Sequence, residues 1–275
     1  MAILLSLCAA AAYGLSDFVG GVASRRISPW AIAFTSQIGG AFAVLLLSLG
    51  VDGSPDRADV GWAVVAGLGN GIGTAFLYRG LSAGRMGVVA PVSGVGAALV
   101  PVVVGVVSGE RPSSFAWLGI VAALPAIWLV ARETSPTAVS GSGLVDGVLA
   151  GLGFGTLFAA LGQIPEESGF LPLALNQVVG AVVVVAVASA VRAAWVPREP
   201  LAYVGLVSGC LGAAATALFL VATQSGYLTV AAVLTSLYPA FTVLLAAAVL
   251  RERIHRSQAI GLVLCTIAVG LIAAS

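Results

Sequence analysis

One carboxylate lies deep within a long apolar stretch of the sequence. Asp17 is the acidic residue that we expect inside a membrane-spanning segment, eight positions before Arg25. A carboxylate in hydrocarbon costs about 2.5 to 3.5 kcal/mol on insertion scales, so it should face the protein interior or a cationic partner. Two interpretations remain open: a structural ion pair with Arg79 or Arg85, and a carboxylate that binds a substrate or a coupling ion.

Uncharged polar side chains recur inside the same apolar stretches. Such groups suit either a polar cavity that a small molecule crosses or interhelical hydrogen bonds worth about 0.6 kcal/mol each. Tyr238 precedes Pro239, whose missing N–H allows a kink that frees a carbonyl group. Together with Asp17, the predicted substrate-binding residues are Gln37, Asn70, Tyr78, Ser93, Gln163, Gln177, Thr235 and Tyr238.

The sequence lacks the residue combinations that are typical of an enzyme. Its one histidine, His255, lies in a short charged corner, and its three cysteines all lie in apolar runs without metal-like spacing. No Ser/His/Asp set, metal cluster or phosphate-binding loop can be recognised. We therefore expect no enzymatic activity, no cofactor and no bound metal.

The composition indicates a protein whose main solvent is lipid. Of the 275 residues, 60% are hydrophobic and only 8% are charged, whereas soluble proteins carry about 25% charged residues. The chain lacks the polar surface that a water-soluble globule needs, and it has no basic run of the kind that binds nucleic acid. The sequence predicts a multi-pass protein of the cell membrane whose partners are the lipid bilayer and a small-molecule substrate.

Ten stretches are long and apolar enough to cross a bilayer as helices, each of which needs about 20 residues. The apolar runs show no strand-like alternation, and an open sheet could not satisfy its edges in lipid. The first stretch has no basic residues ahead of it, unlike a signal peptide, so we expect it to remain as a spanning helix. The predicted spans are 2–22, 29–50, 59–80, 87–108, 113–131, 143–163, 170–191, 201–222, 228–249 and 256–274.

The chain contains an internal repeat. Residues 226–261 align without a gap with residues 84–119, at a constant offset of 142 positions (226 − 84). The offset pairs Glu252 with Glu110 in a charged corner and Thr235 with Ser93 in an apolar run. The same offset pairs Thr216 with Thr74, and an offset of 140 pairs Gln177 and Gly180 with Gln37 and Gly40.

The repeat predicts the architecture. Each half holds five spans, and because five is odd, the second half must enter the membrane from the opposite side. The expected fold is an all-α polytopic membrane protein with ten transmembrane helices in two inverted five-helix repeats. Residues 1–131 form the first repeat, 132–142 a linker rich in Ser, Thr, Pro and Gly, and 143–275 the second repeat.

The charged corners and the glycines that follow them resemble a family signature. Pro239 followed by Leu250-Arg251-Glu252-Arg253, and Gly109-Glu110-Arg111 in the first half, are similar to the Pro…Leu-Gly-Glu-Arg…Gly pattern of the EamA-type transporters of the drug/metabolite transporter superfamily. Tyr13-Gly14 and Phe154-Gly155 resemble the Trp-Gly of the first helix in each half of that family.

The resemblance implies ten helices in two inverted halves around a central cavity, and efflux or exchange of small metabolites such as amino acids. Two features depart from the family pattern. Arg251 replaces the usual glycine of the corner, and Gln37 and Gln177 stand where many members have arginine. The missing arginines argue against strongly anionic substrates.

The orientation in the membrane is predicted differently by two arguments. All twelve basic residues are arginines, and with external termini ten of them fall in cytoplasmic loops, leaving only Arg57 and Arg111 outside. The positive-inside rule therefore favours external termini. The family resemblance implies cytoplasmic termini instead.

The function expected from these observations is secondary transport of a small neutral or zwitterionic, amino-acid-like metabolite by alternating access. We expect spans three, four, eight and nine to form most of the cavity, with spans one and six as gates. A cavity lined by Asn70, Ser93, Thr235 and Tyr238 would favour transport. The alternative is a non-transporting structural or assembly partner, in which the same groups are bonded to neighbouring helices; a membrane enzyme is a third, weaker possibility. The oligomeric state is not determined by the sequence.

Overall fold

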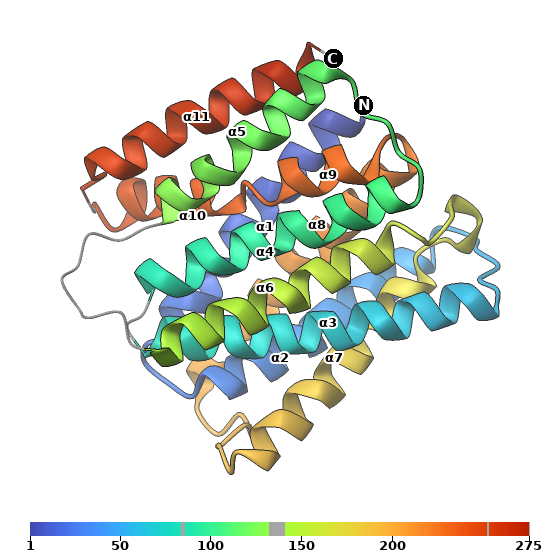
Figure 1. Cartoon of the computed structure of the whole chain (residues 1–275). Helices are drawn as coiled ribbons and strands as arrows, with labels where there is room; N and C mark the ends of the chain where they lie inside the picture. Colours follow the sequence, from blue (N-terminus) through green and yellow to red (C-terminus); the bar gives the residue numbers. More distant parts are fainter. Residues whose placement is uncertain (84–85, 132–140, 252, 275) are drawn as a thin grey trace.

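Long helices run side by side between two ends of the molecule in the computed structural model, which describes residues 1–83, 86–131, 141–251 and 253–274 (Figure 1). The helices are α1 (Ala2–Ser24), α2 (Pro29–Ser48), α3 (Arg57–Ser82), α4 (Met86–Val107), α5 (Ser114–Ala131), α6 (Gly141–Leu161), α7 (Leu171–Ala190), α8 (Val204–Gln224), α9 (Leu228–Thr235), α10 (Tyr238–Val249) and α11 (Arg256–Ala273), with short 3-10 turns at Glu166–Ser168 and Pro200–Tyr203.

Each predicted span corresponds to a helix except the ninth, which the structure divides into α9 and α10. The division falls at Ser236 and Leu237, where the N–H groups bond to Ala232 and Leu234 in a tight turn. Pro239 lies in the first turn of α10 and has no N–H to continue the ladder of α9. The predicted span 228–249 is confirmed as one membrane-crossing segment, and the break falls two residues before Pro239, the proline that the sequence marked as a site for a kink.

Three sequence predictions concern residues outside the described part of the chain. They are the possible Asp17–Arg85 pair, most of the linker at 132–142, and the corner carboxylate Glu252. Gly141, at the end of the predicted linker, already belongs to α6.

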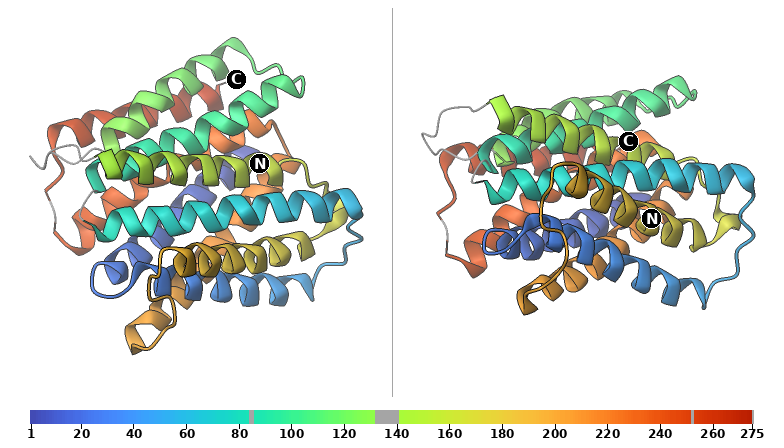
Figure 2. Two further views of the ribbon diagram at one scale, coloured as in Figure 1. Left: turned by 60° about the horizontal axis from the view of Figure 1, so that its bottom comes forward. Right: turned by 90° about the horizontal axis from the view of Figure 1, so that it is seen from below.

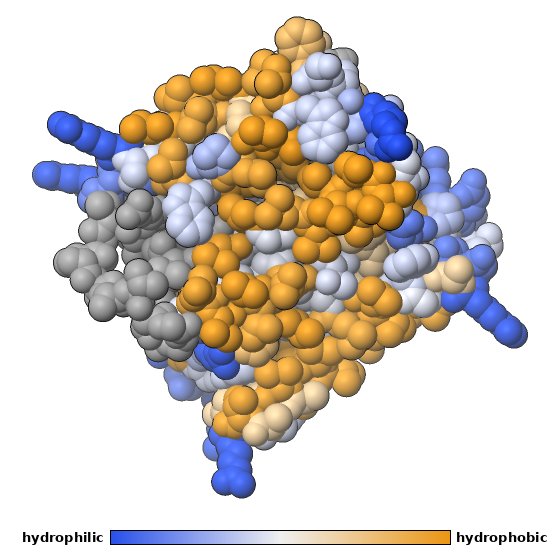
Figure 3. All heavy atoms as spheres, viewed as in Figure 1, coloured by the Kyte–Doolittle hydropathy of each residue, from blue (hydrophilic) through white to orange (hydrophobic). Residues whose placement is uncertain are grey.

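The helices match the thickness of a bilayer. Among the described residues, nine segments are long and apolar enough to cross a membrane, and residues 92–107 of α4 form a shorter apolar helix. Apolar side chains cover most of the face shown in Figure 3, whereas hydrophilic ones gather at its ends. The protein is a multi-pass membrane protein.

The two ends of the helix bundle differ in charge and in the chain segments they hold. Both termini lie at one end (Figure 1), and two further views show the helices running between the same two ends (Figure 2). We call this the terminal end; its connections are 49–56, 108–113, 162–170 and 225–227. The opposite end, with connections 25–28, 191–203 and 250–255, carries Arg25, Arg26, Arg192, Arg198, Arg251 and Arg253 and is called the basic end.

The two halves pack through reciprocal helix pairs. Helix α1 packs against α8 as its repeat equivalent α6 packs against α3, and α2 packs against α8 as α7 packs against α3. Helices α5 and α11, which are equivalent to each other, form a pair of their own. This exchange of partners is what a pseudo-two-fold axis between two copies of one unit requires.

Two glutamines show the same exchange at the level of side chains. A Cβ added at Gly180 would lie 2.7 Å from Oε1 of Gln37, and a Cβ added at Gly40 would collide with the amide of Gln177. Each glutamine thus lies over the glycine of the other half. The absence of a side chain at both glycines lets α2 and α7 approach closely, as small residues do in membrane helix pairs.

Candidate functional site

A cavity of about 350 Å³ opens at the basic end of the bundle. Helices α1 and α10 supply half of its lining residues, and its mouth is formed by Arg25, Arg253 and His255. Ligand pockets for small molecules have volumes of about 300 to 1,000 Å³, so this cavity can hold one small metabolite. Its described walls also include Phe18, Gly21, Val22, Leu77, Leu81, Ala90, Ala131, Pro239, Thr242, Val243, Ala246, Ala247, Leu250, Ile254 and Gln258.

Asp17 and Tyr238 lie at the inner end of the cavity, where they also line a second, smaller chamber. The small chamber has a volume of about 40 Å³, which leaves room for water but not for a metabolite. It lies between the two halves, because equivalent residues of both repeats line it: Gln37 with Gln177, and Thr74 with Thr216.

The polar side chains of the small chamber are bonded to one another across three helices. The Asn70 amide donates to Oε1 of Gln37 at 3.1 Å and to Oε1 of Gln177 at 2.8 Å. The Gln37 amide donates to Asn70 Oδ1 and to Thr74 Oγ1, both at 3.3 Å. This network joins α2 and α3 of the first half to α7 of the second half.

Three tyrosines line the small chamber together with Asp17, and each is held by a hydroxyl group on another helix. The rings of Tyr13 and Tyr238 lie with centroids 6.4 Å apart. The hydroxyl pairs are Tyr13 with Thr216 at 2.7 Å, Tyr78 with Ser208 at 2.9 Å, and Tyr238 with Ser93 at 3.2 Å.

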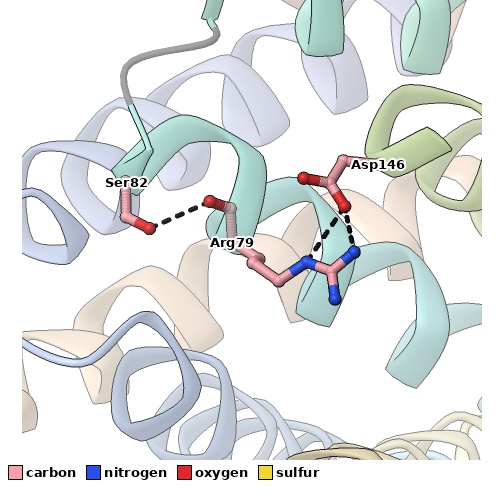
Figure 4. A network of polar contacts seen from close by, with 3 residues as sticks. All are labelled: Arg79, Ser82 and Asp146. Carbon is pink, nitrogen blue, oxygen red and sulfur yellow. Dashed lines mark hydrogen bonds and ion pairs between the residues drawn. The ribbon is translucent and has the colours of Figure 1, made fainter. Parts of the chain in front are cut away.

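Arg79, which the sequence suggested as a partner of Asp17, is paired with another carboxylate. Arg79 of α3 forms an ion pair with Asp146 of α6, with 2.9 Å between Nε and Oδ1 (Figure 4). The Asp17–Arg79 pair, one of the interpretations that the sequence left open, is therefore not formed. Asp146 is almost completely buried, and sequence reasoning missed its role because it lies only one turn inside its helix. No side chain in the described part of the chain bonds to the Asp17 carboxylate.

The terminal end is held shut by bonds between the halves. The Glu110 carboxylate accepts the N–H groups of Leu228 at 2.6 Å and Thr229 at 2.9 Å, so it caps the start of α9. Helix α9 has no cap of its own, and a carboxylate is the favoured partner for free N–H groups at a helix start.

A second set of bonds closes the same end, joining residues 54–59 to the 162–170 connection. Oδ2 of Asp59 accepts the Ser168 hydroxyl at 2.6 Å, and the N–H of Ser54 donates to the carbonyl of Glu167 at 2.9 Å. None of the residues that line the large cavity belongs to these connections. The cavity is thus open at the basic end and separated from the terminal end.

The structure brings most of the predicted site residues together, but not all. Ser93 is buried against Tyr238, and Thr235 donates to the carbonyl of Ser6 at 3.4 Å, so neither lines the cavity or the chamber. Gln163 lies past the end of α6 at the terminal end and bonds to Ala159. Those that line the cavity or the chamber are Asp17, Gln37, Asn70, Tyr78, Gln177 and Tyr238.

The helices around the cavity also differ from expectation. Helix α1, expected as a gate, forms part of the wall, and α8, expected in the wall, reaches only the small chamber. The apolar wall residues could not be found from the sequence, because a leucine facing a cavity and one facing lipid have the same local pattern. The arginines of the mouth could have been found from their clustering at one end.

Comparison with known proteins identifies a family and a fold. The EamA-like transporter family matches the chain twice, over residues 1–132 and 141–274. Twenty chains of solved structures match. One, described only as "Crystal structure of protein", has a TM-score of 0.73 at 16% sequence identity and covers 99% of this chain and 98% of its own, which shows a shared fold. No curated protein matches.

Proposed function

Because the chain belongs to the EamA-like transporter family, we propose that it is a secondary transporter that carries a small neutral or zwitterionic metabolite by alternating access. The family consists of membrane transporters and not of enzymes, so the protein is a transporter that crosses the bilayer several times. The substrate class and the mechanism are the parts proposed here.

The observation that carries the proposal is a cavity that reaches the seam between the halves from one end only. Its inner end, at Asp17 and Tyr238, adjoins the small chamber between the repeats. The terminal end is closed by the Glu110 and Asp59 bonds. A binding site between inverted repeats, accessible from one side at a time, is the arrangement by which such folds carry substrates.

The chemistry of the cavity supports a neutral or zwitterionic substrate. Its inner end carries the Asp17 carboxylate, which repels an anion, whereas Arg25 and Arg253 at its mouth disfavour a simple polycation. The walls between them are mostly apolar. The uncharged Gln37 and Gln177 in the small chamber offer no cation for a phosphate or a dicarboxylate.

The divided ninth span suggests how the cavity changes sides. Helix α9 is buried and anchored by Glu110, whereas α10 lines the open cavity from Tyr238 to Leu250. Between them, the turn at residues 236–237 lets one segment move while the other stays fixed. We propose that α10 closes towards α1 when the terminal end opens, with energy supplied by a solute gradient.

Reconstitution tests the proposal directly. The purified protein is placed in liposomes and offered a panel of labelled amino acids and other small neutral metabolites, with protein-free liposomes as the baseline. We expect saturable flux of at least one member. A panel without flux would contradict the proposal and support the structural or assembly partner, an interpretation that the bonded Ser93 and Thr235 would suit.

Two tryptophan substitutions on one helix separate cavity transport from leakage. Ala246 faces the cavity and Ala248 is exposed on another side of α10. Ala246→Trp fills the cavity and should abolish flux, whereas Ala248→Trp should leave it near the wild-type rate. Equal flux in both variants would show that the substrate does not pass through this cavity.

The membrane orientation determines which side the open cavity faces. The positive-inside rule places the basic end in the cytoplasm, and the family resemblance places the termini there. The two cannot both hold, because the termini lie at the opposite end from the arginines. A reporter fused to the C-terminus that is active on only one side of the membrane decides between them.

A further inference from the structure

The Asp17 carboxylate faces the interior of the protein, where a negative charge is stabilised by a cation. It lies within α1, where a carboxylate is costly unless it meets a partner or water, and it lines both the cavity and the small chamber. Arg79 is paired with Asp146. Arg25 begins eight residues later, which is about 12 Å along the axis of α1, at the mouth of the cavity. The inner end of the cavity therefore has a negative charge and no fixed positive one among the described residues.

The surroundings of Asp17 are aromatic as well as anionic. Tyr13, Tyr78 and Tyr238 line the small chamber together with it, and their hydroxyl groups are already bonded to Thr216, Ser208 and Ser93. The bonds hold the rings in place around the carboxylate. Aromatic rings with a carboxylate beside them are a recurring environment for ammonium groups, to which the ring quadrupole adds attraction.

The charge has no counterpart in the other half. The residue that corresponds to Asp17 is Phe158 (158 − 17 is 141, the offset that also relates Gly14 and Gly155). Phe158 also lines the small chamber and packs against Tyr13 and Phe219, with centroids 5.7 and 4.5 Å away. Around the pseudo-two-fold axis there is thus one carboxylate, opposite an apolar ring. A ligand placed there meets one charged site and has one preferred orientation.

We propose that Asp17, flanked by Tyr238, binds the ammonium group of the substrate, with the apolar body of the substrate directed along Val22, Leu77 and Val243 towards the mouth. Within the proposed class of neutral and zwitterionic metabolites, this selects zwitterions that carry their amine on a small apolar body. A substrate without an amine has no ammonium group to pair with the Asp17 carboxylate. This inference rests on the proposed function, because it names the part of the substrate that the cavity recognises.

A set of three related probes tests the inference by direct binding. Leucine carries both charged groups, 3-methylbutylamine lacks the carboxylate, and 4-methylpentanoate lacks the amine. Their binding to the purified full-length protein is measured by calorimetry at neutral pH. We expect leucine and the amine to bind and the carboxylate not to bind. Equal binding of 4-methylpentanoate and leucine would overturn the inference, and so would the absence of amine binding at millimolar concentrations.

Three substitutions assign the recognition to Asp17. Asp17→Asn keeps the size of the side chain and removes its charge, so it should weaken amine binding by about 10- to 100-fold, the usual value of a hydrogen bond to a charged group. Asp17→Glu should restore part of the affinity. Tyr238→Leu removes one aromatic ring and should weaken binding less. Asp52→Asn, at an exposed carboxylate of the terminal end, is the control and should bind as the wild type does.

The outcomes separate this inference from the proposed function. Amine binding in Asp17→Asn at wild-type affinity, with normal size-exclusion behaviour, would overturn the inference. Flux that continues at the wild-type rate in that variant would overturn it too, while leaving the transport function intact. Amine binding that depends on Asp17 without flux of any probe would support the inference and contradict the transport function.

Discussion

The two ends of the bundle contain equivalent parts of the repeat but are joined differently. At the terminal end, Glu110 caps α9 across the halves and Asp59 binds Ser168. At the basic end, the cavity opens between α1 and α10, which touch deeper in the membrane, where the Thr242 hydroxyl donates to the carbonyl of Gly14 at 3.2 Å. The repeat supplies both ends with the same kind of corner, yet only the terminal end is joined across the halves. Under the proposed function, the two ends would exchange these states.

The basic end is not open all the way across. Arg79 and Asp146 join α3 to α6 beside the cavity, so the halves remain attached there while α1 and α10 separate. The basic end is thus open only between α1 and α10. The substitutions below, from the largest expected effect to the smallest, break or sharpen this comparison.

The ion pair at the basic end should give the largest loss of stability. Asp146→Ala leaves Arg79 without its carboxylate, and breaking a buried pair costs about 3 to 5 kcal/mol; we expect the lower value, because the Arg79 side chain is 35% exposed. Thermal unfolding in detergent measures the loss. The double variant Arg79→Leu with Asp146→Leu should recover most of it. An unchanged midpoint in Asp146→Ala would show that the pair does not hold this end together.

Packing in the seam between the two halves should give the second-largest loss of stability. A Cβ at Gly209 of α8 would collide with the backbone carbonyl of Ser36 in α2, whereas a Cβ at Gly270 meets nothing within 4 Å. Overpacking of this kind costs about 1 to 3 kcal/mol, so Gly209→Ala should lower the unfolding midpoint and Gly270→Ala should not. If both variants unfold alike, α2 and α8 do not approach as closely as described.

The cap at the terminal end should have a smaller effect on stability and a larger one on access. Glu110→Gln keeps one acceptor but loses the charge, at a cost of about 1 to 2 kcal/mol. The closed end should then open more often. A Thr229→Cys reporter in a background without Cys8, Cys210 and Cys265 should react faster with a water-soluble thiol reagent.

The exposed Glu166 lies at the same end, and no side-chain bond of its carboxylate is described. Glu166→Gln is therefore the matched control, and it should leave the labelling rate of the Thr229→Cys reporter unchanged. The same rate in Glu110→Gln and in the unmodified background would mean that the cap does not keep this end shut.

The bond between Asp59 and Ser168 at the terminal end should have the smallest effect on stability. Asp59→Asn removes the charge that accepts two bonds, one from the Ser168 hydroxyl in the other half and one from the N–H of Asp56 at the start of α3. We expect a loss of about 1 kcal/mol in unfolding free energy, as for other caps. Ser168→Ala should match it if the bond between the halves dominates, whereas a change only in Asp59→Asn would assign the effect to the cap of α3.

The sequence predicted the fold well, and the structure shows where the residues predicted for the site lie. Apolar length located every span, and proline identified the place where the ninth one divides. Among polar residues, Asp17, Gln37 and Tyr238 were chosen by type, because such groups at membrane depth need a polar environment, and they line the cavity or the small chamber. Gln163, Ser93 and Thr235 were chosen by the same criterion and lie elsewhere, bonded to their neighbours.

By itself, the sequence determined that the chain is a duplicated bundle in lipid: helix number follows from apolar length, and inversion follows from an odd number of spans in each copy. Only the tertiary structure decided that Arg79 pairs with Asp146 and leaves Asp17 to the cavity. The reason is physical. Helices that are apolar on all sides carry no pattern that distinguishes lipid from a neighbour or a cavity, so partners are selected by close packing of surfaces that are far apart in the chain.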